Sequence, residues 1–369
     1  MVSALSNRFS FTQAKSLVKD LSKPNPKIYW TDFIATVLVG HTAFAAMDRV
    51  HVLVEGPALW FTQVALFCLV AILYMRAAMF IHELVHLPKE GFKGFRIAWN
   101  LLCGIPFLIP SFLYYPHVDH HRRKHYGTEK DGEYLDLSHK PPAYSLAFIL
   151  AALVVPIAGF TRFLVMTPLA WIFPPFRRWV EQHASSMIID VFYIRGDFGE
   201  EARRTMRMQE VLCFFWCCGF ATFGLMQGGI PLIKGYLVAV ALITINNVRT
   251  LGAHRWTGDG DAMSFEEQLL DTVDYPHRPW FTELWGPIGT RYHATHHLFP
   301  SMPYHNLGVA HRRLMEGLPQ DSIYRDVVRV SLVGAIGELW TRSRNRKSNP
   351  VAGPADNSST STEDGKTAA

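Results

Sequence analysis

The chain has 369 residues, of which 49% are hydrophobic and 13% aromatic, and its formal net charge is +5. Long apolar runs alternate with segments that hold nearly all the charge, which is the layout of an integral membrane protein. The basic residues flank these runs and form no single basic face, so we expect no nucleic-acid partner.

Four apolar runs are predicted to cross the membrane, at residues 30–47, 57–81, 211–227 and 235–247. Two other runs, 97–115 and 143–173, are broken by prolines, and we expect them to lie in the interface or to dip in and return. The loops after the first and third spans carry only Arg49 and Lys234, whereas the other connections are rich in Lys and Arg. The positive-inside rule therefore predicts that both termini are cytoplasmic.

These features together predict an all-α integral membrane fold with four transmembrane helices, a cytoplasmic histidine-rich cap and interfacial helices. Residues 1–29 are expected to form a cytoplasmic N-terminal segment and 30–341 the membrane domain. The tail at 342–369 is rich in Ser, Thr, Gly and Asp, and we expect it to be disordered.

Three histidine boxes follow in chain order: "HELVH", "HVDHH" and "HATHH". Residues three and four apart share a face of a helix, so we expect each box to point its imidazoles at one place. In the predicted topology all three boxes are cytoplasmic and converge, and His254, after the fourth span, can reach the same region. The box histidines are His82, His86, His117, His120, His121, His293, His296 and His297.

The first box contains H-E-x-x-H, the signature in which two histidines of a protease hold zinc and Glu83 activates water. A catalytic zinc needs three protein ligands, whereas eight or nine histidines suit two metal ions. We therefore expect Glu83 to orient a ligand histidine. Asp119, His125 and His305 are weaker candidates for residues that contact the ligand histidines. All five cysteines lie in apolar segments and no C-x-x-C pair occurs, so a thiolate site is not expected.

The three boxes in an apolar four-span chain resemble the membrane fatty acyl desaturase family, which includes hydroxylases. The stretch "YHATHHLFPSMPYHNL" (292–307) is especially similar to that family's third box and its continuation, and the resemblance covers roughly residues 30–315. It implies a non-haem di-iron centre held by the eight box histidines, with His254 matching an extra histidine of some members. Those members have an asparagine where this chain has Thr250, so Thr250 and the nearby Asn247 are further candidates around the metals.

The resemblance implies a desaturase that introduces a C=C bond into an acyl chain with O2 and two electrons. A hydroxylase on the same metals is the alternative, and an intramembrane zinc protease using His82, Glu83 and His86 is the alternative from another class. The substrate would be an acyl lipid, an acyl-CoA or a chain on an acyl carrier.

The chain has no ferredoxin cysteine pattern, haem domain or nucleotide loop, so electrons are expected from a separate ferredoxin or cytochrome-type donor. Arg122, Arg123 and Lys124 could meet a phosphate, a CoA or an acidic electron carrier. They equally fit a solvated cytoplasmic face.

Overall fold

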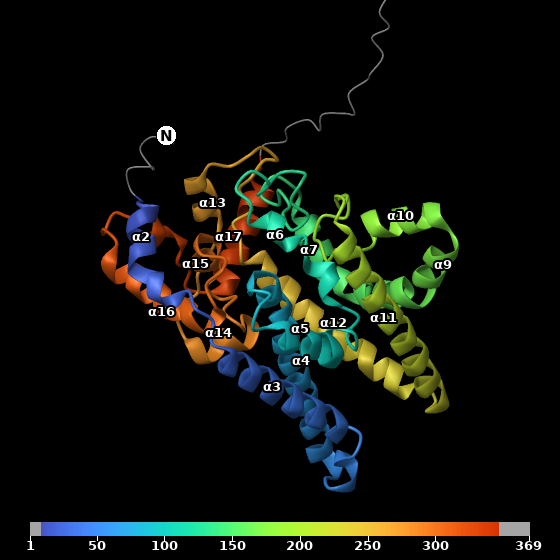
Figure 1. Cartoon of the computed structure of the whole chain (residues 1–369). Coiled ribbons are helices and arrows are strands. Elements are labelled where there is room, and N and C mark those ends of the chain that lie inside the picture. The colour runs from blue at the N-terminus through green and yellow to red at the C-terminus, as the bar shows by residue number, and fades with distance from the viewer. Residues whose placement is uncertain (1–8, 347–369) are drawn as a thin grey trace, which may run out of the picture.

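The computed structural model describes residues 9–346, and this part of the chain is helical, with three isolated β-bridges and no strand (Figure 1). The helices are α2 (Phe11–Val18), α3 (Pro26–Ala46), α4 (Gly56–His86), α5 (Lys93–Trp99), α6 (His117–His120), α7 (Pro142–Leu150), α8 (Val155–Thr161), α9 (Thr167–Ile172), α10 (Pro174–His183), α11 (Glu200–Met226), α12 (Ile230–Leu251), α13 (Phe265–Asp271), α14 (Pro279–Trp285), α15 (His293–Leu298), α16 (Tyr304–Gly317) and α17 (Leu332–Arg344).

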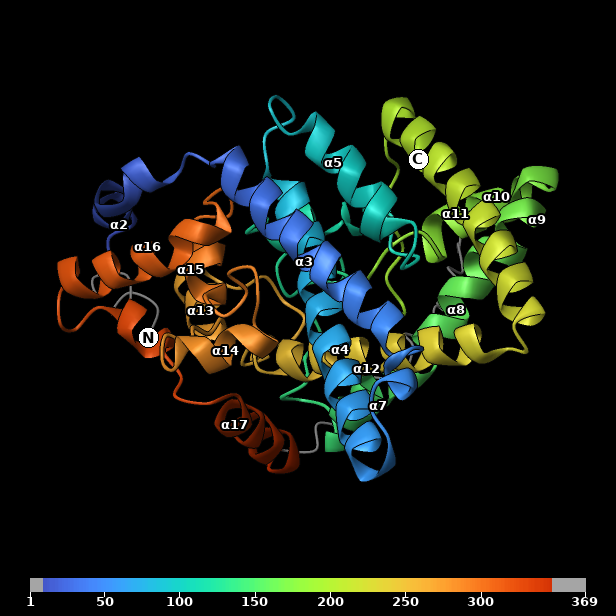
Figure 2. The ribbon, with the colours of Figure 1, turned by 90° about the horizontal axis from the view of Figure 1, so that it is seen from below.

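Two long hairpins, α3–α4 and α11–α12, point away from the end of the molecule that holds α2, α13 and α15 (Figure 1). Local sequence starts these helices: Asn25 caps α3 through its side chain, and α3, α4 and α12 each have proline in the first turn, where no backbone donor is lost. The turn between α11 and α12 uses Gly228 and Gly229 at φ of 68° and 84°, which side chains rarely adopt. Helix α4 packs against both α3 and α12 (Figure 2).

Four helical segments of the described chain are long and apolar enough to cross a membrane, so the predicted all-α fold with four such helices is confirmed. They are Gly56–His86, Val155–Ile172, Glu200–Met226 and Ile230–Leu251. Their identity differs from the prediction in one respect. Helix α3, which covers all but the last residue of the run 30–47, is absent from this set, whereas the segment Val155–Ile172, which we expected to lie in the interface or to dip in and return, belongs to it.

The prolines explain why the segment Val155–Ile172 was not predicted to be a continuous membrane-spanning helix. Pro156 and Pro168 each lie in the first turn of a helix, α8 and α9, where the missing backbone N–H breaks no hydrogen bond. A π-helical turn, Arg162–Met166, joins the two helices. The Arg162 side chain is buried and donates to the Glu210 carboxylate of α11, so the charge within this apolar segment points into the protein.

Helices α2, α13, α15 and α16 form a cap at the end of the molecule away from the hairpin tips (Figure 1). They share one apolar cluster that includes Ala14, Leu269, Ala294 and Leu314. At the C-terminal end, α17 continues to Arg344, so the expected start of the tail at 342 falls in its last turn. Residues 347–369, the rest of that predicted tail, lie outside the described residues.

The buried cluster around Glu210 gives a stability prediction. Glu210 has no exposed side-chain surface, and it accepts from Arg162 and from Arg177, whose Nη1 lies 2.5 Å from its Oε2. Glu210→Gln leaves the buried guanidinium of Arg162 without its counter-charge, while Arg177 keeps its pair with Glu181, and we expect a loss of about 3–5 kcal/mol in the free energy of unfolding. Glu201→Gln, on the exposed start of the same helix, should cost less than about 1 kcal/mol. Denaturant unfolding in detergent compares the two, and equal losses would contradict the assignment.

Candidate metal centre

The nine predicted histidines come together in two neighbouring groups. In each group one nitrogen per ring lies within 4.8 Å of the corresponding nitrogen of every other ring. The first group is His82, His86, His117, His121 and His296, and the second group is His120, His254, His293 and His297. The groups adjoin, since the ring centroids of His121 and His297 are 4.4 Å apart.

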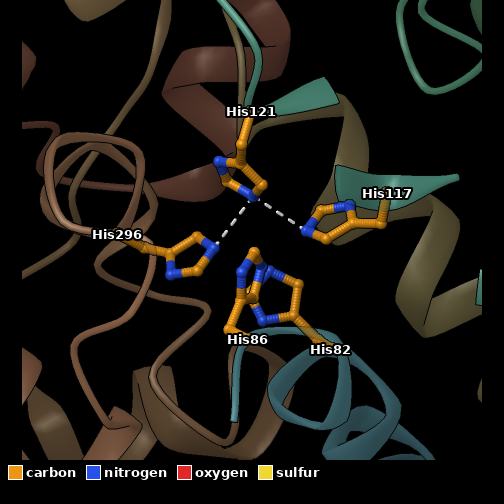
Figure 3. A group of neighbouring side chains, drawn as sticks. All are labelled: His82, His86, His117, His121 and His296. Carbon is orange, nitrogen blue, oxygen red and sulfur yellow. Dashed lines mark hydrogen bonds between the residues drawn. The ribbon is translucent and has the colours of Figure 1, made fainter. Parts of the chain in front are cut away.

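Four short pieces of chain bring these side chains together. The first box lies in the last turns of α4, and His254 follows the end of α12, so the C-terminal ends of these two packed helices bring their histidines together. The second box forms the four-residue helix α6 and its C-cap, and the third box forms α15. Figure 3 shows the rings of the first group turned toward one common point.

From their spacing we expected the second and the third box each to point at one place. Instead, the histidines of each box divide between the two groups. The pairs four residues apart stay together: His117 with His121 in the first group, and His293 with His297 in the second. The remaining members, His120 and His296, join the opposite group. Successive helix positions differ by about 100°, so side chains at i+3 and i+4 diverge by that angle and can face two centres.

The distances between ring nitrogens fit metal coordination. His121 Nε2 lies 2.9 Å from His117 Nε2 and 3.0 Å from His296 Nε2, and His293 Nε2 lies 2.8 Å from His254 Nε2 and 3.1 Å from His297 Nε2. Metal–imidazole bonds of about 2.1 Å place adjacent ligands about 3.0 Å apart and opposite ligands about 4.2 Å apart. Both groups therefore have the spacing of nitrogens around a single ion.

Several of these nitrogens are buried without a hydrogen-bond partner. Neither ring nitrogen of His82 has one, and the same holds for Nε2 of His86. A buried polar atom left unpaired costs about 1–3 kcal/mol, which a coordinated ion would offset. The residues present thus fit one metal ion in each group.

Carboxylates orient part of this set, and these residues were not predicted from the sequence. Nδ1 of His117 lies 2.9 Å from Glu133 Oε2, and Nδ1 of His120 lies 2.8 Å from Asp131 Oδ2. An imidazole that donates from Nδ1 keeps Nε2 free as a ligand, which is the usual arrangement at metal sites. The sequence held a signal in "EKDGEY", where three acidic residues, Glu129, Asp131 and Glu133, closely follow the second box.

The His254 ring is oriented through a tyrosine. Its Nδ1 lies 2.8 Å from the Tyr126 hydroxyl, which donates to Asp271 Oδ2 at 2.7 Å. Asp271 has no exposed side-chain surface, and it also accepts from the backbone and hydroxyl of Thr257. Tyr126 and Asp271 therefore tie the histidine that follows α12 to the cap.

A second buried carboxylate holds the third box. Asp274 accepts from the backbone N–H groups of Ala294 and Thr295 at 2.8 and 3.2 Å, and it pairs with the Thr295 hydroxyl at 2.6 Å. It also lies 2.8 Å from His311 Nδ1. Asp274 thus accepts hydrogen bonds from the free backbone N–H groups at the start of α15 and thereby positions the three histidines of that helix. It too escaped sequence reasoning, because nothing local distinguishes it from other acidic residues.

Burial keeps most of these histidines neutral. It lowers the pKa of His117, His121, His293, His296 and His297 well below the ordinary value, and the neighbouring histidines lower these pKa values further. Burial also lowers the pKa of His120, but the charge and hydrogen bond of Asp131, together with the charges of Glu133 and Asp271, outweigh it and raise the pKa. Neutral imidazole is the form that binds metals, so the five rings are ready ligands at pH 7.

Glu83 is placed differently from the prediction. Its Oε1 lies 3.9 Å from His82 Nδ1, which is too far for a hydrogen bond. Instead the carboxylate accepts from the Tyr29 hydroxyl at 2.5 Å and from the Tyr304 backbone N–H at 3.1 Å. Glu83 therefore links α4 to α3 and α16, and it is not free to activate water as the zinc-protease alternative requires.

None of the other weaker candidates hydrogen-bonds to any of the nine histidines within residues 9–346. Asp119 pairs with Arg122 and His125. His305 accepts from the Asn25 backbone. The remaining two bond elsewhere, the Asn247 amide to the Phe148 carbonyl and the Thr250 hydroxyl to Arg249. These five residues were chosen for nearness in sequence, whereas the groups that contact the histidines are Tyr126, Asp131 and Glu133, farther along the loop after the second box, and Asp271 near His254.

Comparison with known proteins gives two matches. The sequence model described as "Fatty acid desaturase" matches residues 58–328. A protein named "Ceramide hydroxylase" from Caulobacter vibrioides is 37% identical over 350 residues, which is 93% of this chain and 96% of the relative. No solved structure matches the chain significantly.

The Asp131 contact predicts a loss of metal affinity. Asp131→Asn removes the charge that holds the His120 Nδ1 proton, and loss of such a partner typically costs 10–100-fold in metal affinity. Competition with a chelator, followed by elemental analysis, measures the change. Asp119→Asn, which alters no contact to the nine histidines, is the matched control, and an equal loss in that variant would show that the Asp131 contact has no specific role.

The lowered histidine pKa values predict acid sensitivity of the metal-free protein. Below about pH 6.5 the unfolded chain takes up protons that the five buried rings cannot, so stability falls as pH falls through this window. His120, with its raised pKa, and Glu133, whose pKa burial raises to about 8, oppose the effect, but the five rings outnumber them. The thermal midpoint of chelator-treated protein should therefore drop between pH 7 and pH 5. His297→Gln should lessen the drop and His183→Gln, at an exposed position, should not; a flat profile would refute the prediction.

Proposed function

This chain belongs to the fatty acid desaturase family, and from that membership and the geometry of the histidines we propose that it is an O2-dependent lipid hydroxylase of the membrane. The observation that carries the proposal is the convergence of nine buried or partly buried histidines into two groups beside the ends of apolar helices. The 37% identical relative named ceramide hydroxylase supports hydroxylation over the other reactions of the family.

We propose iron as the metal, with one ion in each group. Imidazole ligands suit Zn, Cu, Fe and Ni, so the donor set alone does not distinguish them. The chemistry does, because hydrogen bound to an unactivated carbon is too weakly acidic for a side-chain base to remove. Two bound irons supply the activation of O2 that this reaction needs.

The residues of the chain then have separate tasks. The nine histidines hold the ions, while Asp131 and Glu133 fix the tautomers of His120 and His117. Tyr126 positions His254 in the same way. The apolar core around α3, α4 and α5 excludes water beside the first group. These residues move no proton to the substrate; they position the ligands and keep the site dry.

A ceramide or a closely related acyl lipid is the proposed substrate class. The relative's name supports this choice. Apolar helices α4 and α12 end at the histidines, so an acyl chain that leaves the bilayer can reach the site along apolar surface while a polar headgroup stays near water. We propose that the site and both termini face the cytoplasm, as the distribution of Lys and Arg indicates.

The overall reaction requires an outside source of electrons. Hydroxylation converts R–H, O2, two electrons and two protons into R–OH and one water. Desaturation is the second candidate, and it converts –CH2–CH2– with the same O2, electrons and protons into –CH=CH– and two waters. The similarity of residues 292–307 to the third box of acyl-lipid desaturases favours this second outcome.

Lipid analysis of a host that expresses the chain tests the proposal. We expect lipids that are one oxygen atom heavier, found by mass spectrometry of the ceramide and phospholipid fractions, and about one iron for each of the two groups in the purified protein. A product lighter by two hydrogens would identify the desaturase. Zinc in active protein, or no altered lipid in any fraction, would refute the assignment.

Two histidine variants provide the controls. His296→Ala removes a ring at the centre of the first group and should abolish the product while leaving membrane insertion intact. His183→Ala alters an exposed ring that stacks on Trp179 at 5.1 Å, and it should leave the product unchanged. Full activity in His296→Ala would count against the metal site.

A further inference from the structure

The side chains that line a hollow beside α17 carry more positive than negative charge. Its volume is about 580 Å³, it opens to solvent, and it lies between α17 and the segments just after α12 and just before α17. The residues that line it are Arg255, Arg329, Gly337, Glu338, Thr341 and Arg342. Three guanidinium groups thus face a single carboxylate.

The hydrogen bonds of these arginines leave their charge largely free. Arg255 donates to the Asp326 backbone carbonyl, and its Nε is buried without a partner. Arg329 donates to the backbone carbonyls of Asp326 and Val328, and its Nε lies 3.4 Å from Glu338 Oε2. Arg342 has only a 3.4 Å contact to the Glu338 backbone carbonyl. Such a cluster attracts a negatively charged partner.

The flank of the hollow has the composition of a protein interface. Val333 and Trp340 are seven residues apart on α17 and therefore share a face, which adjoins the hollow on the side of Gly337 and Thr341 and lies across the helix from Arg342. Their exposed fractions are 81% and 46%. Exposed tryptophan and arginine are typical of the residues that carry binding energy between proteins. Helix α17 lies away from the tips of both apolar hairpins, which favours a soluble partner over a lipid headgroup (Figure 1).

The hollow is close to the second group of histidines. Arg255 directly follows His254, whose Nε2 lies 2.8 Å from His293 Nε2. In the other basic stretch near the metals, Arg122 pairs with Asp119 at 2.7 Å and Arg123 lies over the Phe265 ring at 4.2 Å. The hollow differs from that stretch because it gathers three arginines around one carboxylate next to a proposed ligand.

We propose that this hollow is the docking surface for an acidic one-electron carrier protein that reduces the metal centre through the second group. The inference rests on the proposed function, whose reaction needs two electrons per turnover. Two carriers dock in succession, each is oxidised by one electron, and O2 is the final acceptor, so that hydroxylation consumes two protons and releases one water.

A charge reversal at the rim tests the docking surface. The full-length, iron-loaded protein in detergent is combined with a plant-type [2Fe–2S] ferredoxin as the probe, and both binding of the oxidised carrier and product formation with the reduced carrier are measured. Arg342→Glu should raise the Kd and the KM for ferredoxin about tenfold at low salt and weaken their salt dependence. It should leave kcat and the KM for lipid unchanged, and Arg342→Lys should resemble the unaltered protein.

The controls separate the possible failures. Arg312→Glu makes the same charge change on exposed α16, outside the hollow; an equal rise there, or no rise in Arg342→Glu, overturns the docking surface. A rise in the KM for lipid instead would assign the hollow to a headgroup. Protein reduced with dithionite and then given O2 and lipid needs no carrier. If this protein forms product while the kinetics with ferredoxin are unchanged by Arg342→Glu, the docking surface is refuted and the proposed function is not. No product from the unaltered protein with either reductant refutes the proposed function.

Discussion

The gathering of nine largely buried and mostly neutral imidazoles in two adjoining groups is the constraint on which the rest of the structure depends. Each buried ring nitrogen must meet a partner, and the carboxylates near the site satisfy only some of them. The others face one another at distances suited to a shared ion. Burial therefore keeps the rings neutral, and neutrality makes them ligands, so the apolar surroundings are part of the chemistry.

Short helices hold most of these rings, and they are rigid only because the cap holds them. Helix α6 has four residues and α15 has six, too few to be stable alone. Asp274 anchors the start of α15, and Asp131 accepts from both its own loop and His120. Glu83 performs a similar task at a longer range by joining α4 to α3 and α16 through Tyr29 and Tyr304.

The molecule separates its apolar and its charged surfaces around the histidines. The apolar hairpins approach the site from one side, which is where a lipid chain would arrive (Figure 1). The arginine-lined hollow beside α17 lies on the other side, one residue along the chain from His254. In the proposed function this arrangement lets a water-insoluble substrate and a water-soluble carrier reach one centre without competing for the same surface.

Local spacing along the chain was enough to predict the helical fold, the apolar segments and the set of nine histidines, because helix periodicity and hydropathy are properties of neighbouring residues. Local spacing did not predict Val155–Ile172 as a candidate membrane span, because it could not show that Arg162 is buried against Glu210, a residue 48 positions away. Tertiary structure alone decided how the second and third boxes divide between two groups, and it brought Asp131, Asp271 and Asp274 to the site. The division of the boxes and the placement of Asp271 and Asp274 depend on how loops and helices distant in sequence pack together, which no local pattern contains, whereas Asp131 follows the second box closely and left a local signal.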